Sequence, residues 1–372
     1  MLHTDIPSET ELRELNAFRG GICVSLYLPT TPVTRAAKGD CILFKNLATK
    51  AIGQLKDAKA NKRKVASIEA SLMELHDDDL FWAYLADGLA VFATPEEVRT
   101  FRLPIAPAQA AEVSDRFHVK PLVPLLAFPG ASFVLALSQG ATRFIEVTSA
   151  FAGRVKVDDL PRNMSDAVRR QLPRDRAPSG RIQGSEGMRV LTGQYCRIVD
   201  RALRPILTGL RVPLILASVG ELAAIYRMHN SYPHLLKSVI AGNPEQTSEA
   251  ELAKKARDMA RRHARKVIRE RLMQVEHRAG DALASTDVAE IARAAVKGGI
   301  ATLLVDVAAP HPGAVDPETG AIKLATRSGA DTYDVIDELV GLTLGAGGEV
   351  LPLGAASLPN GSPAAATFRF RL

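Results

Sequence analysis

The side chains in this sequence that could do chemistry are mostly cationic, and they gather in two segments. From Ser248 to Arg278, ten Lys and Arg residues stand against five Asp and Glu residues. From Arg154 to Arg189, nine basic residues stand against five acidic ones. Cations repeated along a helix can follow a phosphate backbone, because each contact with a phosphate releases bound counterions. A solvated helix face has the same composition, so contact with a polyanion and simple hydration both fit the pattern.

The helix expected over residues 248–278 has a weak apolar stripe, and the rest of its surface is charged. No aromatic residue is interleaved with the cations, so bases are not expected to stack on it. If it binds nucleic acid, it reads shape and charge rather than sequence. The candidate RNA-binding residues come from this helix, from the second basic segment and from a basic turn near the N-terminus: Lys254, Lys255, Arg257, Arg261, Arg262, Arg265, Lys266, Arg269, Arg174, Arg176, Arg181, Lys62, Arg63 and Lys64.

Other reactive side chains are scattered. The run from His76 to Asp79 holds ligand types that metals use, but side chains of consecutive residues fan out around the backbone, which favours a helix-ending turn. His311 precedes a proline in a polar loop and is interpreted as a surface histidine. Three cysteines, an odd number at wide spacing, predict neither a disulfide framework nor a zinc site. We therefore expect no metal and no cofactor. The cysteines are Cys23, Cys41 and Cys196.

Composition limits the class of protein. The chain has 372 residues, 47% of them hydrophobic and 24% charged, with a formal net charge of +6. This length predicts two or three domains. No apolar run approaches the roughly 20 residues that span a bilayer. The N-terminal stretch carries acids and lacks the apolar core of a secretory signal. We expect a cytoplasmic protein with no membrane partner.

Local patterns predict α/β layers that position these side chains. Pro213–Val219 is an apolar run followed by Gly220 and a helical pattern, which is typical of a buried strand, a tight turn and a helix. Ser132–Ser138 and Thr142–Val147 form an expected hairpin. A second hairpin is predicted around Asp87-Gly88, between apolar runs that begin at Phe81 and Leu89. Ser248, with Glu251 three residues later, marks the start of the basic helix.

The same patterns divide the chain into three predicted α/β domains. The first covers residues 1–127, the second 128–280 and the third 281–372. Residues 154–190 lose hydrophobic periodicity and contain prolines, glycines and mixed charge, which predicts a long mobile loop inside the second domain. The basic helix over 248–278 closes that domain.

Six motifs, met in order along nearly the whole chain, carry a resemblance to a known family. The chain resembles the bacterial relatives of archaeo-eukaryotic class I release factors and Pelota, a group that includes Balon, and its motifs are most similar to family three. The motifs are SLYLPTTP from Ser25, CILFKNL from Cys41, DGLAVF from Asp87, FVLALSQGATRFIEV from Phe133, PLILASVGELAAIYR from Pro213 and GNPE from Gly242.

The resemblance implies an architecture and partners. The first domain would resemble the release-factor domain that faces the decoding site. The second would be RNase H-like, with a loop directed at the peptidyl-transferase centre. The third would be an α/β sandwich similar to kink-turn-binding proteins. The implied partners are the ribosome with its rRNA or tRNA, and a translational GTPase.

Two departures from the family pattern bear on activity. Release factors of this type hydrolyse peptidyl-tRNA with a Gly-Gly-Gln loop, and the nearest match here is Thr192-Gly193-Gln194, at the start of an expected helix. A helix denies the backbone freedom that aims water at an ester. The basic turn Asn61–Lys64 is not the Asn-Ile-Lys-Ser motif that reads stop codons.

These departures favour a ribosome-associated factor for rescue, hibernation or stress that does not catalyse peptide release. One alternative is a peptidyl-tRNA hydrolase that uses Gly193 and Gln194. Another is an unrelated enzyme or ligand-binding protein with a pocket between domains.

Overall fold

The computed structural model describes residues 2–32, 37–127, 130–171, 185–326 and 332–371. The chain forms two compact units. Unit 1 consists of residues 1–2 and 129–263, and unit 2 of residues 3–128 and 264–372. Each unit is built from sheets and helices, which confirms the α/β fold class. The three-domain division at 127/128 and 280/281 stays a prediction beside this division into units.

Unit 1 is built on a five-stranded sheet with the order β7-β6-β5-β8-β9. β5 pairs antiparallel with β6 and parallel with β8, which in turn pairs parallel with β9. The strands are β5 (Ser132–Leu137), β6 (Thr142–Val147), β7 (Ala152–Arg154), β8 (Leu214–Ala217) and β9 (Leu235–Ile240). The helices are α6 (Met164–Gln171), α7 (Ser185–Leu207), α8 (Gly220–His229) and the first half of α9 (Glu249–Ala279).

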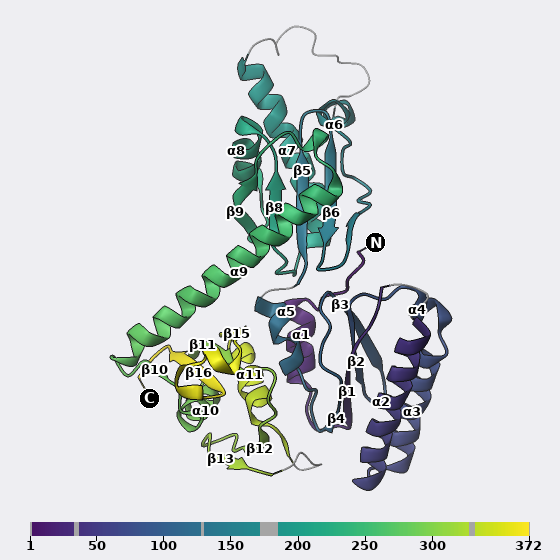
Figure 1. Cartoon of the computed structure of the whole chain (residues 1–372), viewed down its shortest axis with the longest axis vertical. Helices are drawn as coiled ribbons and strands as arrows, with labels where there is room; N and C mark the ends of the chain where they lie inside the picture. Colours follow the sequence, from purple (N-terminus) through teal and green to yellow (C-terminus); the bar gives the residue numbers. More distant parts are fainter. Residues whose placement is uncertain (1, 33–36, 128–129, 172–184, 327–331, 372) are drawn as a thin grey trace. The chain divides into compact units, whose positions relative to one another are not determined.

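Side chains of the sheet in unit 1 alternate between two buried faces, as the period of two along a strand requires. Val134 and Ala136 of β5 share a core with Leu252 and Ala256 of α9, so the start of α9 covers one face. Figure 1 shows α9 crossing the strands there. Tyr195 and other apolar residues of α7 are buried as well and form another part of the hydrophobic core.

Several local predictions for unit 1 are confirmed. β8 is followed by Gly220, whose φ of +45° is in the left-handed region that glycine tolerates. α8 begins at that residue. At the start of α9, the Glu251 backbone N–H donates to Ser248 Oγ over 3.2 Å, which is the expected helix cap. The expected hairpin of β5 and β6 is present.

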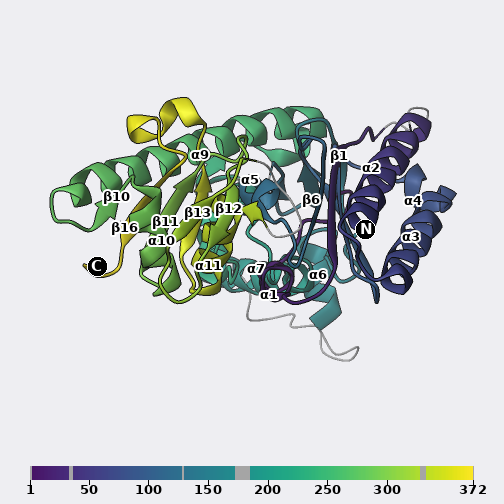
Figure 2. The same ribbon diagram turned by 90° about the horizontal axis from the view of Figure 1, so that it is seen from below.

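The N-terminal part of unit 2 holds a four-stranded antiparallel sheet with the order β3-β2-β1-β4. Its strands are β1 (Cys23–Pro29), β2 (Gly88–Ala93), β3 (Val98–Leu103) and β4 (Ala110–Ser114). The helices α2 and α3 pack against one face and run side by side in Figure 2. The helices are α1 (Glu9–Ala17), α2 (Ala37–Asp57), α3 (Lys62–His76), α4 (Asp79–Ala83) and α5 (Val123–Ala127).

The C-terminal part of unit 2 holds two sheets, with the orders β10-β16-β11-β15 and β13-β12-β14. β11 pairs parallel with β15 and antiparallel with β16. The strands are β10 (Ala284–Ser285), β11 (Ile300–Val305), β12 (Pro312–Val315), β13 (Ile322–Leu324), β14 (Tyr333–Asp334), β15 (Glu349–Pro352) and β16 (Ala364–Phe368). The helices are α10 (Val288–Val296), α11 (Val335–Gly345) and the second half of α9.

One hydrophobic core joins the two parts of unit 2. Tyr27 and Phe92, on the face of the N-terminal sheet opposite α2 and α3, belong to the same buried cluster as Leu303 of β11 and Ile336 of α11. Buried polar contacts add to it: the Lys120 ammonium pairs with the Asp334 carboxylate and donates to the Ala309 carbonyl over 2.8 Å. Residues 3–128 and residues 264–372 therefore stabilise each other within one unit.

The hairpin predicted around Asp87-Gly88 is wrong. Residues 79–83 form the short helix α4 because the Asp78 carboxylate caps it, accepting from the Phe81 backbone N–H over 3.0 Å. β2 begins at Gly88 and pairs instead with β1 and β3. Within the described ranges, no helix is both long enough and apolar enough to cross a bilayer.

Candidate nucleic-acid interface

α9 has one buried face and one basic face. Leu252, Ala253 and Ala256 are fully buried against the sheet of unit 1. Lys254, Arg261 and Arg265 are exposed on the other side. At 3.6 residues per turn, these three cations and Arg269 lie within an arc of about 80°. The sequence predicted this separation only as a weak apolar stripe.

The cations of α9 differ in whether they already have partners. Lys255 pairs with Glu251 over 2.7 Å and Lys266 with Glu270 over 3.8 Å, both one turn apart on exposed surface. Such pairs contribute little to stability and exchange readily with solvent. In the part of the chain that the structure describes, six exposed cations of α9 have no carboxylate within ion-pair distance. Arg262 and Arg278 donate to backbone carbonyls, and within the same part of the chain the other four have neither kind of partner. We call these four the basic stripe: Lys254, Arg261, Arg265 and Arg269.

Two predicted contact residues of α9 are engaged with backbone carbonyls. The guanidinium of Arg257 donates to the Thr148 carbonyl over 2.7 Å and to the Phe151 carbonyl over 3.1 Å. It is half-buried and ties α9 to the turn between β6 and β7. Arg262 Nε donates to the Asp258 carbonyl over 3.2 Å but remains exposed. Arg257 is therefore less available to RNA than its neighbours.

The second basic segment is only partly a loop. α6 covers residues 164–171 and α7 begins at Ser185, so the loop predicted over 154–190 is too long. The prediction failed because the short amphipathic turns of α6 fell among prolines and charges that masked their period. The three candidates of this loop, Arg174, Arg176 and Arg181, lie outside the described residues.

The basic turn near the N-terminus is the first turn of a helix. Asn61 caps α3, and its Oδ1 accepts from the backbone N–H groups of Arg63 and Lys64 over 3.0 and 3.3 Å. The three side chains of Lys62, Arg63 and Lys64 are exposed. Cations at this end of a helix are disfavoured by its dipole, by about 0.3–1 kcal/mol each. Their placement is therefore not explained by stability.

The tripeptide Thr192-Gly193-Gln194 lies inside α7, about two turns from its start. Thr192 Oγ1 donates to the Met188 carbonyl over 2.7 Å. A Cβ on Gly193 would stand 3.1 Å from Nε2 of His229, so this glycine lets α7 approach the end of α8. Gln194 is half-buried. The helical backbone leaves this tripeptide without the freedom of a catalytic loop.

Two motifs that carried the family resemblance close a turn. Glu245, in the short 3₁₀ helix Pro244–Gln246, accepts from Ser138 Oγ over 2.5 Å and from the Gly140 backbone N–H over 3.2 Å. A Cβ on Gly140 would stand 2.7 Å from a Glu245 carboxylate oxygen. The SQG and GNPE segments are therefore joined by hydrogen bonds and close packing, and this contact stabilises the turn after β5.

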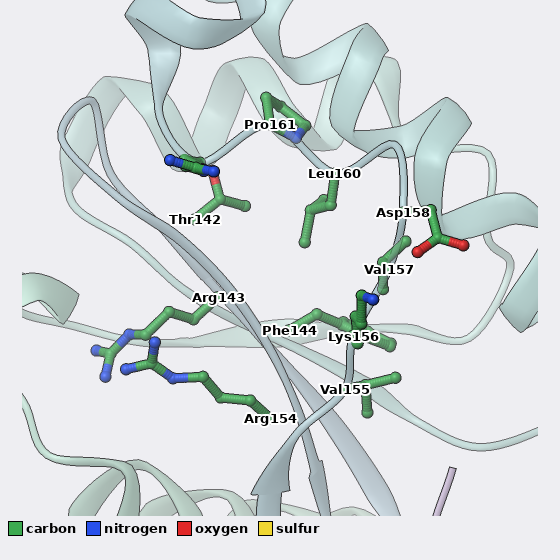
Figure 3. A pocket seen from close by; sticks show the side chains of 11 residues that line it. Thr142, Arg143, Phe144, Arg154, Val155, Lys156, Val157, Asp158, Leu160 and Pro161 are labelled. Carbon is green, nitrogen blue, oxygen red and sulfur yellow. The ribbon is translucent and has the colours of Figure 1, made fainter. Parts of the chain in front are cut away.

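A pocket that sequence reasoning missed lies between β6 and the segment that follows β7. Its volume is about 320 Å³. Figure 3 shows the guanidinium groups of Arg143 and Arg154 next to each other, with Asp158 on the opposite side. In the sequence, only the excess of basic residues over 154–189 pointed to this region, and it did not indicate where a pocket would form. The lining residues are Thr142, Arg143, Phe144, Arg154, Val155, Lys156, Val157, Asp158, Leu160, Pro161 and Arg162.

Three candidate nucleophiles, Cys23, Cys196 and Ser218, are not placed for covalent catalysis. Burial raises the pKa of the Cys23 and Cys196 thiols to about 12, so they stay protonated and unreactive. The Ser218 hydroxyl, after β8, donates to the Leu137 carbonyl over 2.8 Å. Among the described residues, no three His, Cys, Asp or Glu side chains are placed to share a metal ion. The features that remain in the described residues are exposed cations on α/β scaffolds and the pocket beside β6.

The central region of the chain matches a known family model. Residues 129–266 match the family model described as bacterial archaeo-eukaryotic release factor family 11. This match confirms the resemblance to the bacterial archaeo-eukaryotic release factors over that range, with family 11 rather than family three as the matching branch. The range contains most of unit 1, including the pocket and the basic side chains from Lys254 to Lys266. None of the curated proteins matches the chain.

The solved structures to which the chain is similar include three translation factors. S. cerevisiae Dom34, a translation termination-like factor that interacts with Hbs1, is 12% identical, with a TM-score of 0.40 over 65% of this chain and 63% of that chain. An archaeal Pelota, from a model of ribosome-bound Pelota and ABCE1, is 17% identical, with a TM-score of 0.40 over 74% and 73%. Archaeal aRF1 is 14% identical, with a TM-score of 0.25 over 98% and 99%.

Proposed function

We propose that this protein binds the ribosome through RNA and does not itself catalyse peptide release. The observation that carries the proposal is the basic stripe of α9, which begins inside the region matched by the release-factor family. Four cations on one helix face have no carboxylate partner among the described residues. They can therefore neutralise phosphates without first breaking an ion pair.

The position of Gly193 and Gln194 supports the absence of release activity. Peptidyl-tRNA hydrolysis needs a flexible backbone that can place water at the ester. Both residues are in the interior of α7, and Gly193 serves the packing of α7 on α8. The role we propose is ribosome rescue, hibernation or a stress response in the cytoplasm. A translational GTPase is the further partner that the family relationship suggests.

The direct test is sedimentation with bacterial ribosomes through a sucrose cushion at low and high salt. We expect co-sedimentation that weakens as salt rises, because displaced counterions are recovered. A variant with Lys254→Glu, Arg261→Glu and Arg265→Glu should bind at least about tenfold more weakly at the same salt. It should also show a smaller salt dependence.

A matched control changes the net charge by the same amount away from α9. Lys50→Glu, Lys237→Glu and Lys297→Glu alter three exposed lysines on α2, on β9 and after α10. We expect this variant to bind within about threefold of the wild type, because long-range fields are screened beyond roughly 10 Å. Equal losses in both variants, or no ribosome binding by the wild type at any salt, would contradict the proposal.

The competing function is peptidyl-tRNA hydrolysis through the tripeptide in α7. The assay is release of a labelled peptide from ribosomes that hold peptidyl-tRNA. We expect no release by the wild type above the rate without protein. Release that Gln194→Ala abolishes would establish the hydrolase instead.

A further inference from the structure

The pocket beside β6 is held open by the backbone on both of its sides. The Val155 N–H donates to the Phe144 carbonyl over 2.9 Å, and the Thr142 N–H donates to the Arg162 carbonyl over 2.7 Å. The segment from 155 to 162 therefore bridges over β6 between two fixed points. The cavity of about 320 Å³ beneath it lies at the lower end of the range for small-ligand sites.

The charges around this pocket are unbalanced. Four cationic side chains, Arg143, Arg154, Lys156 and Arg162, line it. The carboxylates against them are Asp158, in the lining, and Glu249, which pairs with Arg154. Within the described ranges, the side chains of Lys156 and Arg162 have no ion-pair partner, and both are exposed. A cavity lined in this way favours an anion.

Two of the cations are held in place by their neighbours. Arg143, whose side chain is only 12% exposed, donates to the Thr247 carbonyl over 3.0 Å and also to the Pro244 carbonyl. Arg154 pairs with Glu249, which lies 4.0 Å from Arg143. A guanidinium fixed in this way loses little side-chain freedom when it binds a phosphate.

The remaining wall is apolar. Leu160 and Val157 are half-buried, and Figure 3 shows the Leu160 side chain directed into the pocket. Pro161 completes this wall. Phe144 is 1% exposed and stacks on Phe133 at 4.9 Å, so its ring is not free to stack on a base. The wall therefore suits an apolar contact with a ribose or the edge of a base.

We propose that this pocket binds one unstacked nucleotide, with its phosphate toward the cations and its sugar and base against Leu160 and Val157. The shared chemistry is a nucleoside phosphate, and we assign its source to single-stranded RNA. That choice rests on the proposed function. It is supported by Glu249, which joins the pocket to the first turn of α9, so that a strand leaving the pocket meets Lys254 and Arg261 on the same unit.

The test uses the full chain and a fluorescently labelled RNA hexamer, with binding followed by anisotropy. The pocket variant carries Lys156→Glu and Arg162→Glu, two exposed residues whose loss breaks no ion pair among the described residues. Its matched control carries Lys237→Glu and Arg201→Glu, one exposed Lys and one exposed Arg on β9 and α7 of the same unit. We expect the pocket variant to bind at least about tenfold more weakly and the control within about threefold.

A duplex RNA of the same length separates the pocket from general electrostatics. A nucleotide stacked in a helix cannot enter the pocket, so the pocket variant should bind duplex RNA like its control. Equal losses for single-stranded and duplex RNA, or equal losses in the pocket variant and the control, would overturn the proposal. So would a wild type that does not bind the hexamer.

Adenosine monophosphate distinguishes the two sources of the ligand. One outcome would be that adenosine monophosphate binds the wild type but not the pocket variant, while RNA binds both proteins equally. In that case the pocket binds a free nucleotide, and the assignment to RNA is wrong. The variant of Lys254, Arg261 and Arg265 separates this inference from the proposed function. Loss of ribosome binding in that variant, with normal hexamer binding in the pocket variant, would refute the pocket alone.

Discussion

At the scale of single residues, the same side-chain type has different roles in different surroundings. Arg257 and Arg261 are one turn apart on α9. The first is committed to two backbone carbonyls, whereas the second is exposed and without a carboxylate partner in the described structure. Charge counts along the sequence treat these residues as equivalent. Only the geometry separates cations that hold the fold from cations that can meet a ligand.

His118 gives a prediction about pH at this scale. Burial by itself would lower the pKa of His118. The charge and hydrogen bond of Asp337, 3.3 Å away, outweigh the effect of burial, and the charges of Asp334 and Glu112 add to them. The pKa of His118 is therefore raised above 6.5. A raised pKa in the folded state stabilises the protein fully below the pKa of the unfolded chain, and this stabilisation is lost as pH rises through the folded value.

His118→Gln should therefore cost more free energy of unfolding at pH 5.5 than at pH 8.5. The measurement is urea denaturation of wild type and variant across that range. His263→Gln is the control, because His263 is exposed on α9 and has no hydrogen-bond partner among the described residues. A cost for His118→Gln that does not change with pH would show that the pair with Asp337 is not ionised.

At the scale of secondary-structure elements, the cations at the start of α3 lower the stability of the fold, and they are candidates for contact with RNA. Lys62→Glu with Lys64→Glu replaces two exposed cations at the positive end of the helix dipole. We expect the protein to gain about 0.3–1 kcal/mol of unfolding free energy per substitution. If these residues contact RNA, the same variant should co-sediment less with ribosomes, and both quantities can be measured on one preparation.

Lys56→Glu is the matched control for α3. Lys56 is in the last turn of α2, where the dipole favours a cation, and it pairs with Glu69 over 3.3 Å. The same change of charge should lower stability there. If the α3 variant gains stability and keeps full ribosome binding, the N-terminal basic turn is not part of the interface.

The elements show how far the sequence could be read. β8 with Gly220, the hairpin of β5 and β6, and the Ser248 cap of α9 were predictable because each depends on residues a few positions apart. The helix α4 was missed because the Asp78 cap competed with a run of apolar residues that also suits a strand. The pocket could not be predicted, since its walls are joined by the β6–β7 pairing and by the backbone bonds from 142 to 162 and from 155 to 144, which no local pattern indicates.

At the scale of the whole molecule, the least predictable feature is the joining of distant segments inside unit 2. Lys120 and Asp334 are 214 positions apart and form a buried ion pair, with side chains 3% and 10% exposed. Asp334 also caps α11, accepting from the Ile336 N–H over 2.9 Å. No local pattern marks either residue as part of a pair.

This pair gives a prediction of stability. Lys120→Met keeps the length of the side chain but leaves the Asp334 carboxylate buried without its cation. We expect a loss of about 3–5 kcal/mol of unfolding free energy, as for other buried pairs with one partner removed. Lys56→Met, which removes a surface pair, should cost less than about 1 kcal/mol. Denaturant titrations of both variants provide the comparison, and similar small losses would show that Asp334 is solvated.

The division of unit 2 into residues 3–128 and 264–372 has a consequence for biosynthesis. A nascent chain emerges in order, so the face of the N-terminal sheet that holds Tyr27 and Phe92 is made before the strands and helices that cover it. Unit 1 is contiguous from residue 129 and can fold while that face is still open. The segment translated after unit 1 therefore covers the apolar face of the segment translated before it.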